Sequence, residues 1–161
     1  MAARGNAETT ESQGRVLMIE RVFDAPRELV FRCWTEPAHL ERWMGPRGFT
    51  IRLLACDLRP GGNLRVHMRA PDGRDHWQNG IFREIVPPER LVRTFCWTDE
   101  EGAPRSPETV LTVTFADLGG KTRLTLHQAI FESVNARNEH QEGWSSSFDV
   151  LTEYLAAVRA G

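Results

Sequence analysis

The pattern of apolar and polar positions divides this chain into two parts. Apolar residues recur at helical spacing over residues 133–159, whereas across residues 49–131 they alternate with polar residues as in half-buried strands. One face of the predicted helix carries Trp144, Phe148, Leu151, Leu155 and Val158. A long helix after a run of antiparallel strands buries such a face against the sheet, because no other element is large enough to cover it. The pattern therefore predicts a cup that is closed by a helix.

Seven strands are predicted, and turn sequences rich in Gly, Pro and Asp separate most of them. They span residues 16–23, 49–57, 63–69, 77–86, 91–97, 109–115 and 122–130. Gly80 lies in the middle of the fourth strand, where a glycine predicts a bulge that bends the sheet. Strand parity places His67 and His127 opposite the apolar residues, on the face turned to solvent.

Two short helices are predicted between the first and second strands. The first runs from Arg27 to Trp34, with Asp24 as its N-cap, and Glu36-Pro37 ends it. The second carries Leu40, Trp43 and Met44. Both are too short to form a domain, so we expect them to plug the open end of the sheet.

Composition indicates one globular domain. The chain has 161 residues, 40% of them hydrophobic and 26% charged, which suits a single domain over residues 15–160. Residues 1–14 contain no apolar stretch, so they are expected to be a flexible tail rather than a secretory signal. No window approaches the roughly 18 apolar residues that cross a bilayer, so we predict a cytoplasmic protein without membrane insertion.

Charge and cysteine content exclude several functions. Lys plus Arg number 20 and Asp plus Glu number 22, for a net charge of −2, so no basic field recruits nucleic acid. Cys33, Cys56 and Cys96 are far apart and show no CxxC spacing, which predicts free thiols in a reducing compartment and no zinc site. A monomer and a homodimer are both compatible with the sequence, because exposed edge strands permit pairing without requiring it.

Motifs of known catalytic chemistry are missing from the sequence. There is no GxSxG, HExxH, Walker loop, GxGxxG or DxD cluster, so no catalytic residue, metal or cofactor is predicted. His140 precedes Trp144 by four residues and therefore shares its helix face, close to Arg137 and Gln141. It is a candidate for a polar group at the rim of an apolar pocket; alternatively, His140 and Arg137 only solvate the first helical turns.

Aromatic residues and one arginine complete the set of candidates. Trp residues occur at positions 34, 43, 77, 97 and 144, where large rings either line a cavity or, as is more common, fill a core. Arg93 shares strand parity with Leu91, Phe95 and Trp97. If this face is inward, the buried cation needs an anionic partner or ligand; if it is outward, Arg93 stacks on exposed aromatic rings.

A series of short motifs, in this order, carries a resemblance to a known family. They are FDAPRELVF at 23–31, LERW at 40–43, DLRPGG at 57–62, PDG at 71–73, GIFREI at 80–85, PPERLV at 87–92, HQEGW at 140–144 and LTEYL at 151–155. Over residues 16–158 the chain resembles the AHSA-type branch, the homologues of the activator of the 90-kDa heat-shock protein ATPase, within the START-like SRPBCC superfamily.

This resemblance implies an α+β helix-grip fold, in which a curved antiparallel sheet of about seven strands wraps around a long C-terminal helix and leaves a cavity for hydrophobic or amphipathic molecules. It does not imply one activity, because relatives on this fold include lipid carriers, hormone receptors, polyketide cyclases and aromatases, and co-chaperones. The eukaryotic co-chaperone has a separate N-terminal chaperone-binding domain. We expect no room for that domain in 161 residues, which disfavours a chaperone partner.

The leading hypothesis is a protein that binds a small hydrophobic molecule between helix and sheet, without defined catalysis. The predicted cavity wall consists of Phe49, Met68, Phe82, Phe95, Trp97, Leu111, Val113, Leu126, Trp144, Phe148 and Leu151. Trp43 is expected at the mouth, and His140, Arg93 and Gln128 are the candidate polar anchors. A cyclase- or aromatase-like enzyme would need at least two polar side chains converging in the cavity. A co-chaperone-like interaction module would instead show an exposed apolar patch on the outer sheet face.

Overall fold

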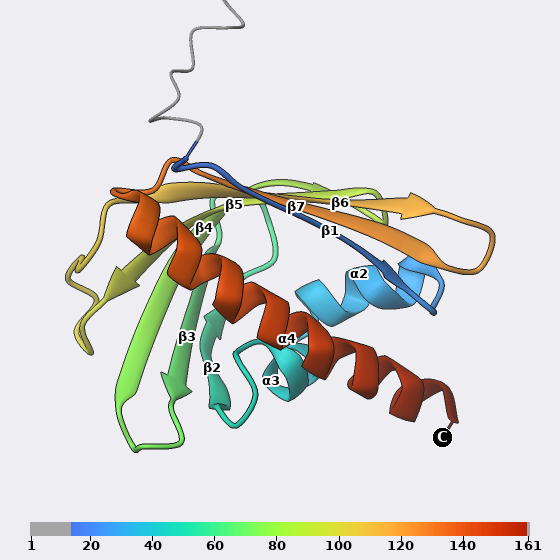
Figure 1. The fold of residues 1–161 in the computed structure, drawn as a ribbon, viewed down its shortest axis with the longest axis horizontal. Helices are drawn as coiled ribbons and strands as arrows, with labels where there is room; N and C mark the ends of the chain where they lie inside the picture. The colour runs from blue at the N-terminus through green and yellow to red at the C-terminus, as the bar shows by residue number, and fades with distance from the viewer. Residues whose placement is uncertain (1–13, 161) are drawn as a thin grey trace, which may run out of the picture.

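A computed structural model describes residues 14–160. Within this range the elements follow in the order β1 (Leu17–Phe23), α2 (Arg27–Thr35), α3 (Pro37–Trp43), β2 (Thr50–Cys56), β3 (Asn63–Arg69), β4 (Asp75–Val86), β5 (Arg90–Thr98), β6 (Thr109–Asp117), β7 (Thr122–Ala129) and α4 (Val134–Ala160). The strands form one antiparallel sheet in the order β1-β7-β6-β5-β4-β3-β2. The sheet curves, and α4 runs diagonally across its concave side (Figure 1). The predicted helix-grip arrangement, with seven strands and two short helices after the first, is confirmed.

The C-terminal half of α4 forms the centre of the core. Phe148, Leu151 and Leu155 are buried, and the Phe148 ring meets Phe23 of β1 edge-to-face at 5.8 Å between centroids. Burial of each such side chain contributes about 1.5–3 kcal/mol to folding. Hydrophobic burial along this half of the helix therefore fixes α4 to the sheet.

Helices α2 and α3 fill the space beside this half of α4, as predicted (Figure 1). Trp34 of α2 is buried against Trp43 of α3, and the Trp43 indole N–H donates to the carbonyl of Cys33 at 2.8 Å. The predicted capping residue is wrong: the N-cap of α2 is Pro26, without a side-chain cap, and Asp24 instead accepts a hydrogen bond from Arg159 near the end of α4. The two short helices thus close one end of the cup.

Gly80 has a different role from the predicted one. The register shift in the β4–β5 pairing lies between Phe82 and Glu84, so the bulge is not at Gly80. A Cβ atom at Gly80 would lie 2.3 Å from the carbonyl oxygen of Thr94 and 2.9 Å from Nη1 of Arg93. Glycine is needed here because the backbone of β5 and the Arg93 side chain approach β4 too closely for any larger residue.

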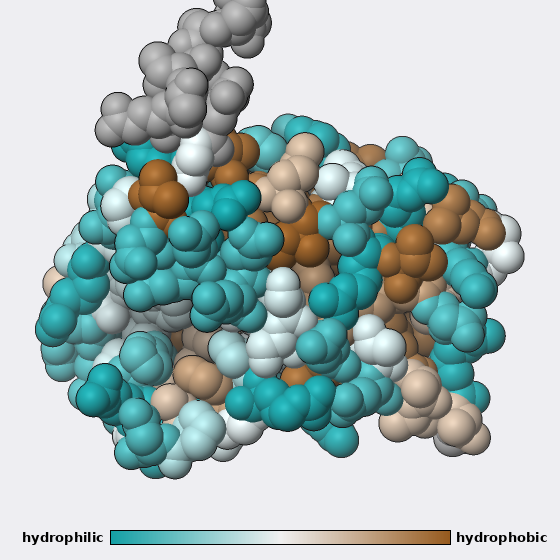
Figure 2. Space-filling model, in the orientation of Figure 1, coloured by the Kyte–Doolittle hydropathy of each residue, from teal (hydrophilic) through white to brown (hydrophobic). Residues whose placement is uncertain are grey.

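The surface of residues 14–160 is largely polar on the face shown in Figure 2. Hydrophilic residues cover most of the face seen in Figure 2, and apolar residues form small separate groups on it. None of the described helices is long and apolar enough to cross a membrane.

Cys33, Cys56 and Cys96 are free thiols, as predicted, and burial raises the pKa of Cys33 to about 12. The flexible tail predicted for residues 1–14 lies, except for Gly14, outside the described residues.

Candidate functional site

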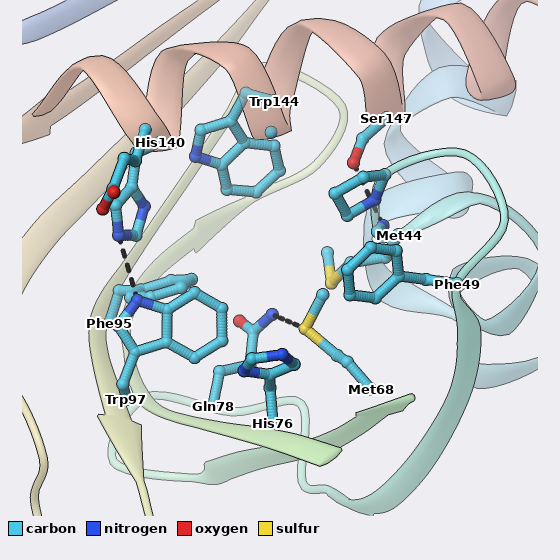
Figure 3. Close-up of a pocket in the computed structure, with 14 residues that line it drawn as sticks. Met44, Phe49, Met68, His76, Gln78, Phe95, Trp97, His140, Trp144 and Ser147 are labelled. Carbon is cyan, nitrogen blue, oxygen red and sulfur yellow. Dashed lines mark hydrogen bonds between the residues drawn. The ribbon is translucent and has the colours of Figure 1, made fainter. Parts of the chain in front are cut away.

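A cavity of about 350 Å³ lies between the N-terminal half of α4 and the sheet. Strands β3, β4 and β5 form its floor, and the loop between α3 and β2 forms one side (Figure 3). It is lined by Met44, Gly45, Pro46, Phe49, Met68, His76, Gln78, Phe95, Trp97, Glu139, His140, Gly143, Trp144 and Ser147. Aromatic rings and methionine side chains supply most of this wall, so the cavity suits an apolar body with a few polar contacts.

The loop on one side of the cavity is tied to α4 by hydrogen bonds. The amide of Gly45 donates to the hydroxyl oxygen of Ser147 at 3.1 Å, and the amide of Arg47 donates to that of Ser146 at 2.9 Å. Gly45 has a φ of +136°, and a Cβ there would lie 2.5 Å from Ile51, so only glycine fits this turn. The loop therefore holds Met44 and Phe49 against the cavity.

His140 and Trp97 join α4 to β5 on the opposite side. The Trp97 indole N–H donates to Nε2 of His140 at 3.0 Å (Figure 3). The imidazole also packs against the rings of Phe95 and Phe131. Burial lowers the pKa of His140 to about 4. The imidazole is therefore neutral at pH 7, and because Nε2 accepts a hydrogen bond, its proton is on Nδ1.

Trp144 forms the roof of the cavity. Its indole N–H donates to Oε1 of Gln128 at 2.9 Å, and Nε2 of Gln128 donates to the hydroxyl of Thr109 at 2.9 Å. One face of Trp144 stacks on Trp34 with a centroid distance of 5.6 Å. Gln128 is fully buried beneath the indole and orients it, but does not line the cavity.

Arg93 lies behind the floor. It faces inward and is only 1% exposed, and its guanidinium donates to the Thr94 carbonyl at 3.3 Å and to Oε1 of Gln78 at 3.2 Å. Both acceptors are neutral, so the anionic protein partner expected for an inward Arg93 is not found among residues 14–160. Burial lowers the pKa of Arg93 to about 10, which leaves it charged at neutral pH.

The structure brings six of the predicted site residues together around the cavity. They are Phe49, Met68, Phe95, Trp97, His140 and Trp144. Nine others are buried but do not line it: Trp43, Phe82, Arg93, Leu111, Val113, Leu126, Gln128, Phe148 and Leu151. Trp43, expected at the mouth, is 1% exposed inside the core. The difference arises because the inward faces of β6 and β7 and the C-terminal half of α4 fill their part of the cup with side chains.

Several lining residues were not predicted. Gln78 could have been found, since it shares strand parity with Phe82, which was expected to face inward. Ser147 lies three residues after Trp144 and shares its helix face. Met44, predicted in the second short helix, is the C-cap of α3, and Gly45 and Pro46 follow it in a turn that gives no periodic signal. Glu139 and His76 are exposed at the rim.

The other two candidate histidines lie outside the cavity, as strand parity predicted. His67 is on the outer face of β3, where its ring stacks on Trp77 and Nε2 lies 2.8 Å from Asp75. His127 is on the outer face of β7. No group of three His, Cys, Asp or Glu side chains able to hold a metal ion occurs in the described part of the chain.

Comparison with known proteins identifies the family. The sequence profile of the family described as activator of Hsp90 ATPase homolog 1-like protein, AHSA1, matches residues 24–156. No curated protein sequence matches this chain. Among solved structures, a protein from Arthrobacter aurescens is 27% identical with a TM-score of 0.83, covering 92% of this chain and 90% of its own.

Two further structures agree. Protein CV1439 from Chromobacterium violaceum is 28% identical with a TM-score of 0.79, over 88% of this chain and 96% of its own. The AHSA1 protein from Silicibacter pomeroyi is 25% identical with a TM-score of 0.79, over 88% of this chain and 98% of its own. With the profile match across most of the chain and the shared START-like fold, this chain belongs to the AHSA1 family.

Proposed function

We propose that this protein binds a small hydrophobic or amphipathic molecule in the cavity between α4 and strands β3–β5. The observation that carries this proposal is the cavity itself, about 350 Å³ with a wall of aromatic rings and methionines. Ligand sites typically measure about 300–1,000 Å³ and have mostly apolar walls with a few polar groups. Two larger hollows on the surface are lined mainly by polar residues, so it is the apolar wall that distinguishes this cavity.

Gly143 supports this proposal because it leaves space in the roof of the cavity. A Cβ at Gly143 would meet only Cγ of Pro46, at 3.9 Å, and both residues line the cavity. Glycine inside a helix costs about 1 kcal/mol relative to alanine. Glycine therefore destabilises the helix slightly at a position where a larger side chain would enter the cavity.

Binding is favoured over catalysis by the state of His140. A cyclase-like enzyme needs polar groups that polarise or deprotonate its substrate. The single acceptor nitrogen of the neutral His140 ring already receives the Trp97 N–H, so it is not available as a base. His140 is thus suited to holding Trp97 in place and not to acting as a catalytic base.

The interaction-module alternative has less support. The outer face of β1 exposes Met18 and Val22, but Glu20 lies between them on the same face. A docking surface of the co-chaperone type would need a continuous apolar patch there.

Titration with N-phenyl-1-naphthylamine, a neutral dye that fluoresces in apolar surroundings, tests the proposal. We expect saturable one-site binding by the wild type and by Gly143→Ala. Gly143→Leu should bind at least tenfold more weakly, since its side chain would enter the cavity, while circular dichroism shows an intact fold. Absence of binding to the wild type, or equal binding by Gly143→Leu, would contradict the proposal.

A further inference from the structure

Arg93 is a buried cation whose hydrogen bonds end on neutral groups. Its two acceptors are the Thr94 carbonyl and Oε1 of Gln78, and its Cζ lies 5.5 Å from the centroid of the Phe95 ring. The Cys56 thiol is the ionisable group that interacts with it, and burial raises the pKa of this thiol, so it brings no negative charge at neutral pH. A charge without a counter-ion is costly in the interior unless something else compensates for it.

The position of Arg93 determines how the Gln78 amide is oriented. Arginine has only donors, so the amide oxygen of Gln78 must face the guanidinium and the amide NH₂ must face away from it. Gln78 is 3% exposed and lines the cavity floor, where its Nε2 has a contact of 3.3 Å with Sδ of Met68 (Figure 3). A thioether is a weak acceptor and uses one of two N–H groups. The floor therefore presents an N–H donor without a strong acceptor.

The charge behind the amide strengthens this donor. Gln78 and Phe95 separate the guanidinium from the cavity, and in such a low-dielectric region the field of a cation is only weakly screened. Hydrogen bonds in a chain also polarise one another, so donation by Arg93 to the amide oxygen makes the amide N–H a better donor. The acid of the cavity wall, Glu139, is exposed to solvent at the rim, where water screens it.

We propose that Gln78, polarised by Arg93, is the specificity-determining residue of the cavity, and that it selects flat apolar molecules carrying an accepting oxygen: a carboxylate, ketone or phenolate. The oxygen would bind at the Gln78 amide and the ring body would lie among Phe49, Trp97 and Trp144. This inference rests on the proposed function and names the chemical class of its ligand. Because the guanidinium lacks a counter-ion, a negatively charged oxygen gains the most at this position.

Three probes with one ring system test the inference: 2-naphthoate, 2-acetylnaphthalene and the hydrocarbon 2-isopropylnaphthalene. Their dissociation constants are measured by quenching of tryptophan fluorescence, since Trp97 and Trp144 line the cavity. The decisive variant is Gln78→Glu, which keeps the acceptor for Arg93, supplies its missing counter-ion and removes the N–H donor. Its thermal midpoint should not fall below that of the wild type.

Gln141→Glu is the matched control. Gln141 also accepts a hydrogen bond from an arginine, at 2.6 Å from Arg137, but lies outside the cavity. The substitution therefore makes the same change of charge beside the same type of partner without touching the proposed site.

In Gln78→Glu the affinity for 2-naphthoate should fall at least thirtyfold and that for the ketone about tenfold, whereas the hydrocarbon should change less than threefold. Gln141→Glu should leave all three affinities within twofold. If the ratios among the three dissociation constants are the same in Gln78→Glu as in the wild type, whether or not all three probes bind more weakly, the inference is overturned and the proposed function stays in place. Failure of every probe to bind the wild type would overturn the proposed function, and the inference with it.

Discussion

Phe148, Leu151 and Leu155 on the C-terminal half of α4 are buried in the core, whereas His140, Gly143 and Trp144 on the N-terminal half border a cavity. Both halves face the concave side of the same sheet (Figure 1). The C-terminal half meets α2, α3 and β1, which fill the space in front of it. The N-terminal half faces β3–β5 across a gap with no helix in between.

This difference shows how one helix serves both stability and binding. Hydrogen bonds hold the residues around the cavity: Trp97 to His140 and Gly45 to Ser147 join lining residues to one another, and Trp144 is held by Gln128 from outside the cavity. Polar contacts thus keep the wall in place where apolar packing is incomplete. The following predictions test the contrast between the two halves.

Leu151→Ala should have the largest effect on stability and none on binding. Leu151 is fully buried in the packed half, so its truncation should lower the free energy of unfolding by about 2–5 kcal/mol. Urea denaturation measures this loss, and the folded variant should bind N-phenyl-1-naphthylamine within twofold of the wild type. A loss of unfolding free energy below 1 kcal/mol, or a selective loss of dye binding, would contradict the assignment of the C-terminal half of α4 to stability and not to binding.

Acid should destabilise the protein through His140. Its pKa is about 4 in the folded protein and about 6.5 when unfolded, so the unfolded state binds the proton more readily between these values. The neutral ring makes its full contribution to the free energy of unfolding above pH 6.5. As the pH falls toward 4, this contribution is lost, which lowers the free energy of unfolding by up to about 3 kcal/mol. Unfolding free energies of the wild type and His140→Gln across this range should therefore converge as pH decreases. Parallel pH profiles would contradict burial of a neutral His140.

Ser147→Ala should have an intermediate effect at the boundary between the halves. It removes the acceptor for the Gly45 amide, which is buried, and an unsatisfied buried donor costs about 1–2 kcal/mol. The loop that carries Phe49 should also become less ordered, so dye affinity should fall severalfold. Urea denaturation and dye titration measure the two effects; unchanged values in both would show that this bond does not hold the loop.

Gly143→Ala should have the smallest effect and the opposite sign. Alanine is the better helix former, so the free energy of unfolding should rise by about 0.5–1 kcal/mol while the dye still binds. Thermal and urea denaturation measure the gain. A destabilised Gly143→Ala would mean that the helix approaches its neighbours too closely there for a methyl group.

The fold was predictable because apolar periodicity and turn residues agree along the chain. Residues 63–69 were placed as a strand with the bounds that the structure has, and the stripe from Phe148 to Leu155 is buried as expected. The cavity was predictable only in part. Parity tells which face of a strand is inward, as for Phe82 and Phe95, but not whether a helix or an open space lies opposite. Only Phe95 of these two borders the cavity.

The polar part of the site could not be read from residue types alone. Arg93 was recognised as a cation that needs a partner, but its partner is the neutral Gln78, which lies across the β4–β5 pairing. Gly80 makes room for this contact, and the sequence indicated a bulge there instead. Cross-strand register decides which side chains meet, and it depends on the bulge beyond Phe82, which no local pattern marks.

A crystal structure of the wild type with 2-naphthoate tests the central claim most directly. The account predicts one molecule in the cavity at the N-terminal half of α4, with its ring among Phe49, Trp97 and Trp144 and a carboxylate oxygen within hydrogen-bonding distance of Nε2 of Gln78. A cavity that stays empty at saturating ligand, or a carboxylate that points to solvent away from Gln78, would contradict it.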